Sequence, residues 1–511
     1  MAKKRSARAK TDAQRVKGRP GPQEADGRTR TAQPQTAPAE STRTGQPETA
    51  PAESTRTGQP QTAPTESTRA GQPQTAPTAQ NAAPASNPED APAAEPASSN
   101  PATQEAPAKP QKSYVRFNPP PVSLETTLPG VKLDFNYGAR VVIPEGNYHV
   151  RFTDLDTSSI LYDADASNVI VTSTKKFYIH FLVEVWKDGQ LALSHELRLK
   201  DKVVHIRFPV GTLGDILAWF PYAEEFRKVH GCKVYCSMSE KIAALLAPAY
   251  PEITFIKPET SPEDCYATYY MGIFFPADDR FHQPADFRVI GLQLNIPYIL
   301  GLDVVERRPI LTPSPERPIE EPYVCIAAQA TSQAKYWNNP RGWIETVDFL
   351  KALGYRVLCI DKEKCHGYGR HWNTIPYGCE DFTGGRPLQE RVDYIAHADF
   401  FIGLSSGLSW LAWGTGTPVI MVSGFTLPYN EFHTPYRVIN FHVCNGCWTD
   451  SSEEFVHADF GWCPRHENTE REFECTRFIS SGQVCQTIRR LMEDYGLDPK
   501  KGKRREPSHG K

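Results

Sequence analysis

Large hydrophobic residues are missing from the first part of the chain and recur at regular spacing in the rest. Residues 1–113 contain no Leu, Ile, Phe, Tyr, Trp or Cys. A segment without these side chains cannot bury enough apolar surface to offset the entropy lost on folding. Four successive 13-residue units, rich in Thr, Pro and Gln, fill residues 28–79. We therefore expect residues 1–113 to be a long disordered tail.

Residues 114–200 have the pattern of a β-rich module. Short segments such as KLDFNYG, ARVVIP and FLVEVWKDG alternate or cluster β-branched and aromatic residues between Pro, Gly and Asn. This alternation is typical of strands that bury one face. Lys187-Asp188-Gly189 has the composition of a tight hairpin turn. The pattern predicts a small antiparallel sheet.

From residue 201 the pattern changes to alternating strands and helices. The strand VVHIRFP is followed by an amphipathic helix that ends at Gly231, then by KVYCSMS, a helix over 240–249 and ITFIKP. A second series of the same kind runs from YVCIAAQA to PVIMVSG. Alternation of this kind predicts parallel, doubly wound sheets with helices on both faces. We expect two α/β domains, residues 201–310 and 320–440, with a ligand cleft between them.

Four cysteines near the C-terminus have the spacing of a metal site. They follow the order C-x2-C, fifteen residues, C, eleven residues, C, and they are Cys444, Cys447, Cys463 and Cys475. Such spacing suits a tetrahedral thiolate site, and a metal would stabilise an otherwise polar segment. Two disulfides are the alternative, and spacing alone suggests zinc, although iron accepts the same ligands. We expect a metal finger over residues 441–478, followed by a C-terminal helix and basic tail over 479–511.

The charge of the chain and its lack of long apolar runs limit the partners and the compartment that we expect. The chain has 57 Lys and Arg against 60 Asp and Glu, a formal net charge of −3. A near-neutral chain implies no large nucleic-acid face. The basic termini are expected to be solvated arms, with weak tethering to nucleic acid or an anionic surface as the alternative. Because there is no secretory signal and no apolar run long enough to span a bilayer, we expect a cytoplasmic protein.

Three segments carry candidate chemistry at the predicted cleft. Asp215 stands in the first turn of a predicted helix, where it could deprotonate a hydroxyl or serve only as a helix-start acid. Lys335 follows the first strand of the second domain and could neutralise a leaving diphosphate, or be a solvated loop lysine. The third segment is a strand-to-helix turn that contains Ser405, Ser406, Gly407 and Leu408. Its N–H groups would face a phosphate at the start of the helix. Alternatively, its small residues simply permit a tight turn.

Taken together, these motifs resemble a known family. The strand-G-x-x-G-D-helix, the T-S-x-x-K-x-W loop and the S-S-G-L-S helix start are similar to those of the ADP-heptose:lipopolysaccharide heptosyltransferases. Those enzymes are two-domain, metal-independent sugar-nucleotide transferases of GT-B architecture. With the β module and the four-cysteine finger, residues 114–497 more narrowly resemble the bacterial autotransporter heptosyltransferases, also called autotransporter strand-loop-strand O-heptosyltransferases.

The resemblance implies an α/β, GT-B-like fold and a specific reaction. Heptose would pass from ADP-glycero-manno-heptose to Ser hydroxyls, with Thr as an alternative, of an autotransporter adhesin passenger. It also implies one structural iron per subunit, held by the four cysteines, and a large symmetric homo-oligomer, a dodecamer. It makes Asp215 the catalytic base and assigns donor binding to Thr212, Leu213, Gly214, Lys335, Ser405, Ser406, Gly407 and Leu408.

The predicted mechanism is a single, inverting displacement. Asp215 takes the acceptor proton, while Lys335 and the helix start at Gly407 hold the departing ADP. This chain has Ser405-Ser406 where the lipopolysaccharide enzymes have Asp-Thr, and Trp410 where they have His, so their donor-sugar contacts do not carry over. Alternatives are a heptosyltransferase of the lipopolysaccharide core, a non-enzymatic nucleotide-sugar-binding module and a metal-ribbon nucleic-acid binder.

Overall fold

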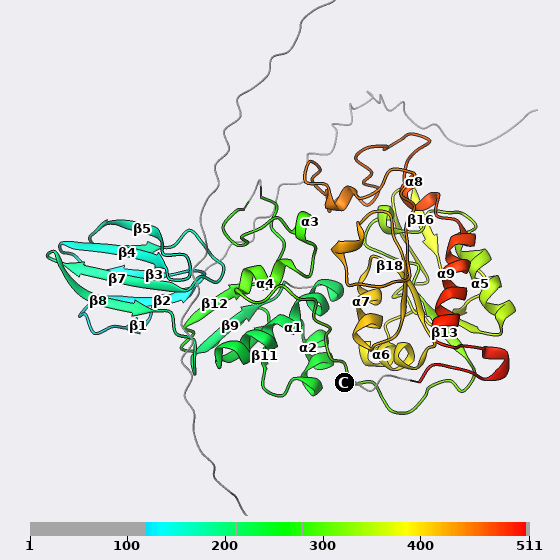
Figure 1. The fold of residues 1–511 in the computed structure, drawn as a ribbon, viewed down its shortest axis with the longest axis horizontal. Coiled ribbons are helices and arrows are strands. Elements are labelled where there is room, and N and C mark those ends of the chain that lie inside the picture. Colours follow the sequence, from blue (N-terminus) through cyan, green and yellow to red (C-terminus); the bar gives the residue numbers. More distant parts are fainter. Residues whose placement is uncertain (1–118, 210–211, 277–278, 507–511) are drawn as a thin grey trace, which may run out of the picture. The chain divides into compact units, whose positions relative to one another are not determined.

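The computed structural model of the protein describes residues 119–209, 212–276 and 279–506 (Figure 1). These residues belong to one compact unit, Thr103–Lys511. The predicted disordered tail, residues 1–113, lies outside the described residues. No helix of the described part is long and apolar enough to cross a membrane.

The predicted β module contains two kinds of strand. An antiparallel sheet has the order β5-β4-β7-β8. In its β7–β8 hairpin, Lys187 pairs with Gln190, and Asp188 and Gly189 have φ of 49° and 80°, which confirms the predicted turn. The strands of residues 119–200 are β1 (Leu124–Glu125), β2 (Lys132–Asn136), β3 (Arg140–Ile143), β4 (Tyr148–Asp154), β5 (Ser159–Ala166), β6 (Val169–Thr172), β7 (Phe181–Lys187) and β8 (Gln190–Glu196).

The other strands of this region extend the sheet of the following α/β domain. Among the described residues, that sheet has the order β11-β10-β9-β12-β2-β3-β6, with β1 paired to β2. Strand β2 runs parallel to β12 and antiparallel to β3. The sequence suggested one separate antiparallel module. In the structure only β4, β5, β7 and β8 form a sheet of their own, and the other strands join the sheet of the α/β domain. The strands that the α/β domain itself contributes to this sheet are β9 (Val203–Arg207), β10 (Lys233–Ser237), β11 (Thr254–Ile256) and β12 (Ala267–Tyr270).

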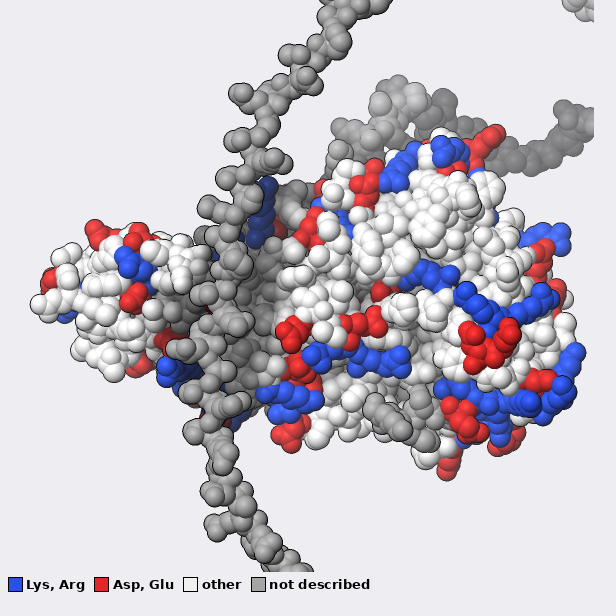
Figure 2. All heavy atoms as spheres, viewed as in Figure 1, with Lys and Arg blue, Asp and Glu red and all other residues white. Residues whose placement is uncertain are grey.

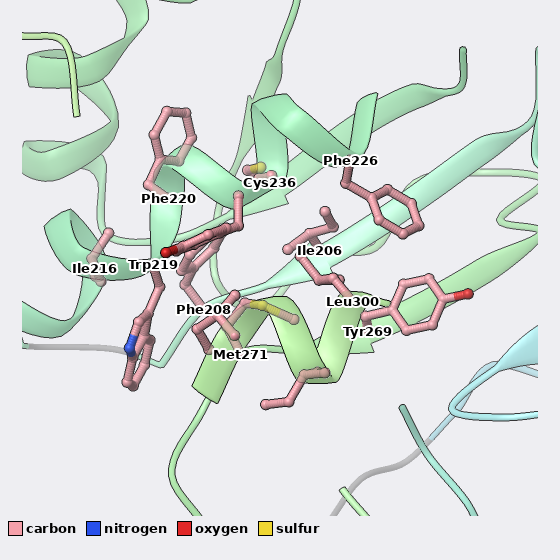
Figure 3. Close-up of a cluster of buried hydrophobic side chains, with 14 of the residues drawn as sticks. Ile206, Phe208, Ile216, Trp219, Phe220, Phe226, Cys236, Tyr269, Met271 and Leu300 are labelled. Atoms are coloured by element: carbon pink, nitrogen blue, oxygen red, sulfur yellow. The ribbon is translucent and has the colours of Figure 1, made fainter. Parts of the chain in front are cut away.

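Helix α1 (Leu213–His230) is the central helix of the first α/β domain, and it ends at Gly231 in the left-handed conformation, as predicted. Residues 216–223 are all buried. The expectation of an amphipathic helix was therefore wrong, because α1 is enclosed by β10, α4 and α7. Figure 3 shows its aromatic side chains packed with residues of β9, β10 and β12. The other helices here are α2 (Glu240–Leu246), α3 (Phe287–Ile290) and α4 (Asn295–Leu300).

The second α/β domain has the predicted parallel sheet, in the order β17-β14-β13-β18-β19-β20. A β-hairpin, β15–β16, is inserted between its strands and was not predicted. The strands are β13 (Tyr323–Ile326), β14 (Arg356–Cys359), β15 (Cys365–Tyr368), β16 (His371–Thr374), β17 (Glu380–Asp381), β18 (Phe401–Leu404), β19 (Val419–Val422) and β20 (Arg437–Val438). The helices are α5 (Gly342–Leu353), α6 (Leu388–His397), α7 (Gly407–Gly414), α8 (Glu474–Arg477) and α9 (Ser481–Asp494).

The basic C-terminal run is partly built into the fold. Arg505 is buried, and its Nε donates a hydrogen bond of 3.1 Å to the Ala398 carbonyl. Arg504 donates to the Glu320 carbonyl at 2.8 Å. Arg505 is therefore not part of a solvated arm, contrary to the sequence-based expectation, whereas Arg504 is exposed. On the face shown in Figure 2, basic and acidic side chains are interspersed, without an extended basic patch among the described residues.

Candidate active site

The N-terminal ends of α1 and α7 lie directly against each other, although they belong to different domains. A Cβ atom on Gly407 would lie 3.1 Å from the Gly214 nitrogen and 3.2 Å from the Leu213 Cβ atom. A Cβ atom on Gly214 would lie 3.0 Å from Cδ1 of Trp410. A side chain at either position would therefore push the two helix starts apart by a few tenths of an ångström. The contact brings the predicted residues Thr212–Asp215 beside Ser406–Leu408.

Asp215 lies in the first turn of α1 and is half-buried. Burial raises the pKa of its carboxyl group, while a hydrogen bond from the Thr212 hydroxyl and the charge of Lys335 act in the opposite direction. A carboxylate with a raised pKa is a stronger base than an exposed one. Asp215 therefore combines the position and the basicity required to accept a proton.

Lys335 comes to the same place from the second domain, at the end of a short 3-10 turn (Gln333–Lys335). Burial lowers the pKa of its ammonium group, and the charges of Asp215 and Glu431 oppose that shift. Its Nζ atom lies 5.8 Å from the ring centroid of Phe425 and 5.9 Å from that of Trp448. The structure thus brings Lys335 near Asp215, and its ammonium group lies beside two adjacent aromatic rings.

The start of α7 has the features of an anion-binding helix end. Ser406 is the N-cap residue, and its buried Oγ atom has no hydrogen-bond partner among the described residues. The first turn of α7 contains no acidic residue. A helix N-terminus with an available hydroxyl can accept a phosphate. The Ser405 hydroxyl differs, because it donates a hydrogen bond to Glu431.

Glu431 and its neighbours are part of the site but were not predicted. Glu431 is buried, forms an ion pair of 2.8 Å with Arg437, and accepts a hydrogen bond of 3.0 Å from the Asn430 side chain. Asn430 and Glu431 lie in the segment between β19 and β20, and Arg437 is the first residue of β20; no hydrophobic periodicity or motif marks them. Only the fold places them beside Lys335.

The four predicted metal ligands lie near one another, and three of them, Cys444, Cys447 and Cys463, belong to or pack against an aromatic cluster. Burial raises the pKa of the Cys475 thiol, and the other three cysteines raise it further. Burial, followed by the nearby Cys444, raises the pKa of Cys447 to about 12. All 12 cysteines of the chain lie in the described residues and are free thiols, so the predicted alternative of disulfides is not present.

Among the described residues, the group of ligand atoms close enough to share a metal contains one of these cysteines rather than all four. Ligand atoms of Cys444, His466 and Glu474 all lie within 4.8 Å of one another. The Glu474 carboxylate is already engaged by the Cys444 backbone N–H at 2.9 Å and by Arg471 at 2.6 Å. His466 was not predicted. A group of thiols with a nearby imidazole fits a soft or borderline metal such as zinc or iron.

Comparisons with known proteins show which families the chain resembles. The family described as "Glycosyltransferase TibC, N-terminal domain" matches residues 129–189, and "Glycosyltransferase family 9 (heptosyltransferase)" matches residues 287–455. The autotransporter heptosyltransferase BAHTCr of Citrobacter rodentium is 53% identical over 389 residues, which are 75% of this chain and 94% of that protein. BimC of Burkholderia thailandensis, an inactive autotransporter heptosyltransferase, is 40% identical over 389 residues, 75% of this chain and 92% of that protein.

A solved relative covers the folded part. The crystal structure of the iron-containing dodecameric glycosyltransferase TibC from enterotoxigenic Escherichia coli H10407 is 50% identical, with a TM-score of 0.72 over 74% of this chain and 100% of that chain. A complex of dodecameric TibC with ADP-D-beta-D-heptose gives the same values.

The two α/β domains and these matches define a glycosyltransferase of the heptosyltransferase class. The chain belongs to the autotransporter heptosyltransferase family.

Proposed function

We propose that this protein transfers heptose from ADP-glycero-manno-heptose to Ser hydroxyls, with Thr as an alternative, of an autotransporter adhesin passenger. The observation that carries the proposal is the meeting of Asp215, Lys335 and the α7 start at one domain contact. The complex of TibC with an ADP-heptose supports the donor. The family name supports the acceptor.

The reaction is a single displacement with inversion. Asp215 accepts the proton of the acceptor hydroxyl as its oxygen bonds to the anomeric carbon, and the bond from that carbon to the diphosphate breaks. Lys335 and the N-terminus of α7 hold the negative charge of the departing ADP. Thr212 orients Asp215, and the Ser406 hydroxyl is available to the donor. Ser405 acts indirectly, because its hydroxyl is bound to Glu431.

We also propose that residues 441–478 form a finger holding one structural iron, with zinc as the alternative. The gathering of Cys444, Cys447, Cys463 and Cys475 supports this, as does the iron in TibC. A metal there would cross-link a segment that otherwise has few apolar residues. A large symmetric homo-oligomer, as in dodecameric TibC, and a cytoplasmic location complete the proposal.

Intact mass spectrometry of a Ser-rich passenger fragment tests the transfer. The full chain is incubated with the fragment and ADP-heptose, with UDP- and GDP-sugars in parallel. We expect heptose-sized increments with the ADP donor only, and their loss in Asp215→Ala. Asp348→Ala removes an exposed carboxylate from α5 and is the matched control. Unmodified passenger in every reaction, while a lipopolysaccharide-core acceptor is labelled, would replace the protein acceptor by a lipid-linked sugar.

Elemental analysis of the purified chain tests the metal. We expect about one iron per chain, and Cys463→Ser should lose the metal and solubility together. A soluble and active Cys463→Ser protein without metal would show that the finger needs no metal.

A further inference from the structure

The turn that carries Lys335 is attached to the predicted finger through its backbone. The Gln333 N–H donates a hydrogen bond of 2.8 Å to the Phe460 carbonyl, and the Ser332 hydroxyl donates to the same carbonyl at 3.3 Å. Phe460 lies between the second and third of the four cysteines. The position of the Lys335 turn therefore depends on the fold of the finger.

A finger side chain also contacts the ammonium group itself. Trp448 directly follows Cys447, and its ring lies 5.9 Å from Nζ of Lys335, on the cation that Phe425 also faces. Trp448 is 9% exposed. A partly desolvated ammonium over an indole face is stabilised by the ring quadrupole, an effect of about 0.5–2 kcal/mol in proteins. Trp448 thus limits the directions in which the Lys335 side chain can point.

Trp448 also forms hydrogen bonds with the segment that contains Phe425 and Asn430. Its Nε1 donates a hydrogen bond of 2.9 Å to Oδ1 of Asn430, and its backbone N–H donates to the Phe425 carbonyl at 3.2 Å. Asn430 in turn donates to Glu431, whose charge acts on Lys335. One residue therefore links a predicted metal ligand, the aromatic partner of Lys335 and, through Asn430, the acidic residue Glu431.

We propose that Trp448 is a positioning residue that directs Lys335 toward the donor diphosphate, so that the finger completes the donor site rather than only stabilising the fold. The inference rests on the proposed function in one respect, the assignment of Lys335 to the diphosphate. A flexible lysine has a large rotamer entropy, and fixing it before the donor binds lowers the cost of binding.

Binding of ADP, measured by isothermal titration calorimetry on the full chain, tests this without requiring transfer. Trp448→Leu is compared with Trp462→Leu, the matched control. Trp462 is 6% exposed, lies in the same aromatic cluster and precedes Cys463, but its ring contacts are with Phe425 and Phe455. We expect the dissociation constant for ADP to rise about tenfold in Trp448→Leu and less than about twofold in Trp462→Leu. Trp448→Phe keeps a ring face and should recover most of the affinity.

A double-mutant cycle separates positioning from general stability. In a Lys335→Met background, Trp448→Leu should cause no further loss of ADP affinity. Metal content, measured on each variant, should equal that of the wild type; if Trp448→Leu loses metal, the Lys335→Met background decides, because a structural loss of affinity would persist there and a positioning loss would not. The proposal is overturned if the Trp448 and Trp462 variants lose affinity equally, or if the loss persists without Lys335.

A wild-type protein that labels the passenger but gives equal ADP affinity in all variants would overturn only this inference. Absence of both ADP binding and transfer would overturn the proposed function as well.

Discussion

The two helix starts that meet at the candidate active site have the same geometry and opposite chemistry. Both α1 and α7 follow a strand of a parallel sheet and approach each other through a glycine, Gly214 or Gly407. The first turn of α1 contains its own carboxylate, Asp215. The first turn of α7 contains no acid, and its N-cap hydroxyl, Ser406, has no partner among the described residues.

This difference explains how one contact can serve two tasks. The partial positive charge of a helix start favours any nearby anion. At α1 a side chain of the protein already occupies that position, whereas at α7 the position remains available to an anion from outside. We therefore assign proton transfer to the α1 side and phosphate binding to the α7 side, with Lys335 contributing charge to both.

Removing the carboxylate from the α1 start should have the largest effect. Asp215→Asn preserves the size of the side chain but cannot accept the proton, so we expect kcat to fall by about a thousandfold. ADP affinity, measured by calorimetry, should stay within about threefold, because the α7 side is unchanged. A variant that retains most of its transfer rate would remove Asp215 from the mechanism.

Removing the cation should affect both sides at once. For Lys335→Met we expect kcat/KM for the ADP donor to fall by about a hundredfold, since an ammonium group opposite a leaving diphosphate acts on the ground state and the transition state. Initial rates at varied donor concentration measure this. An unchanged donor KM together with an unchanged kcat would show that Lys335 only packs against Phe425 and Trp448.

Separating the two helix starts should have a smaller effect. Gly407→Ala would place a methyl group 3.1 Å from the Gly214 nitrogen, so the helices must move apart by a few tenths of an ångström. We expect kcat to fall about tenfold. The control is Gly482→Ala in the first turn of α9, where the nearest atom to the added methyl group is 3.7 Å away. Equal rates in both variants would show that the close approach is not needed.

The smallest expected effect is a shift in pH dependence. The Thr212 hydroxyl lowers the pKa of Asp215, against the larger effect of burial. Asp215 is active when deprotonated, so activity is lost as the pH falls through its raised pKa. In Thr212→Val the acid limb of the kcat/KM profile should therefore move to higher pH. An acid limb that stays in place or moves to lower pH would contradict the hydrogen bond.

The sequence by itself determined what depends on neighbouring residues. The order of strands and helices, the end of α1 at Gly231 and the hairpin turn at Asp188-Gly189 all follow from local patterning. Asp215, Lys335 and the segment 405–408 stood out because each follows a strand in a parallel α/β arrangement, where ligands bind at the carboxyl edge.

The tertiary structure decided what depends on contacts between distant residues. Strand β2 joins the parallel sheet of the next domain, Arg505 is buried beneath α6, and Trp448 reaches Lys335, which is more than 100 positions earlier in the chain. None of these contacts leaves a periodic signal, because the partners lie on separate elements. Local sequence shapes each element, but only packing between elements decides which side chains meet.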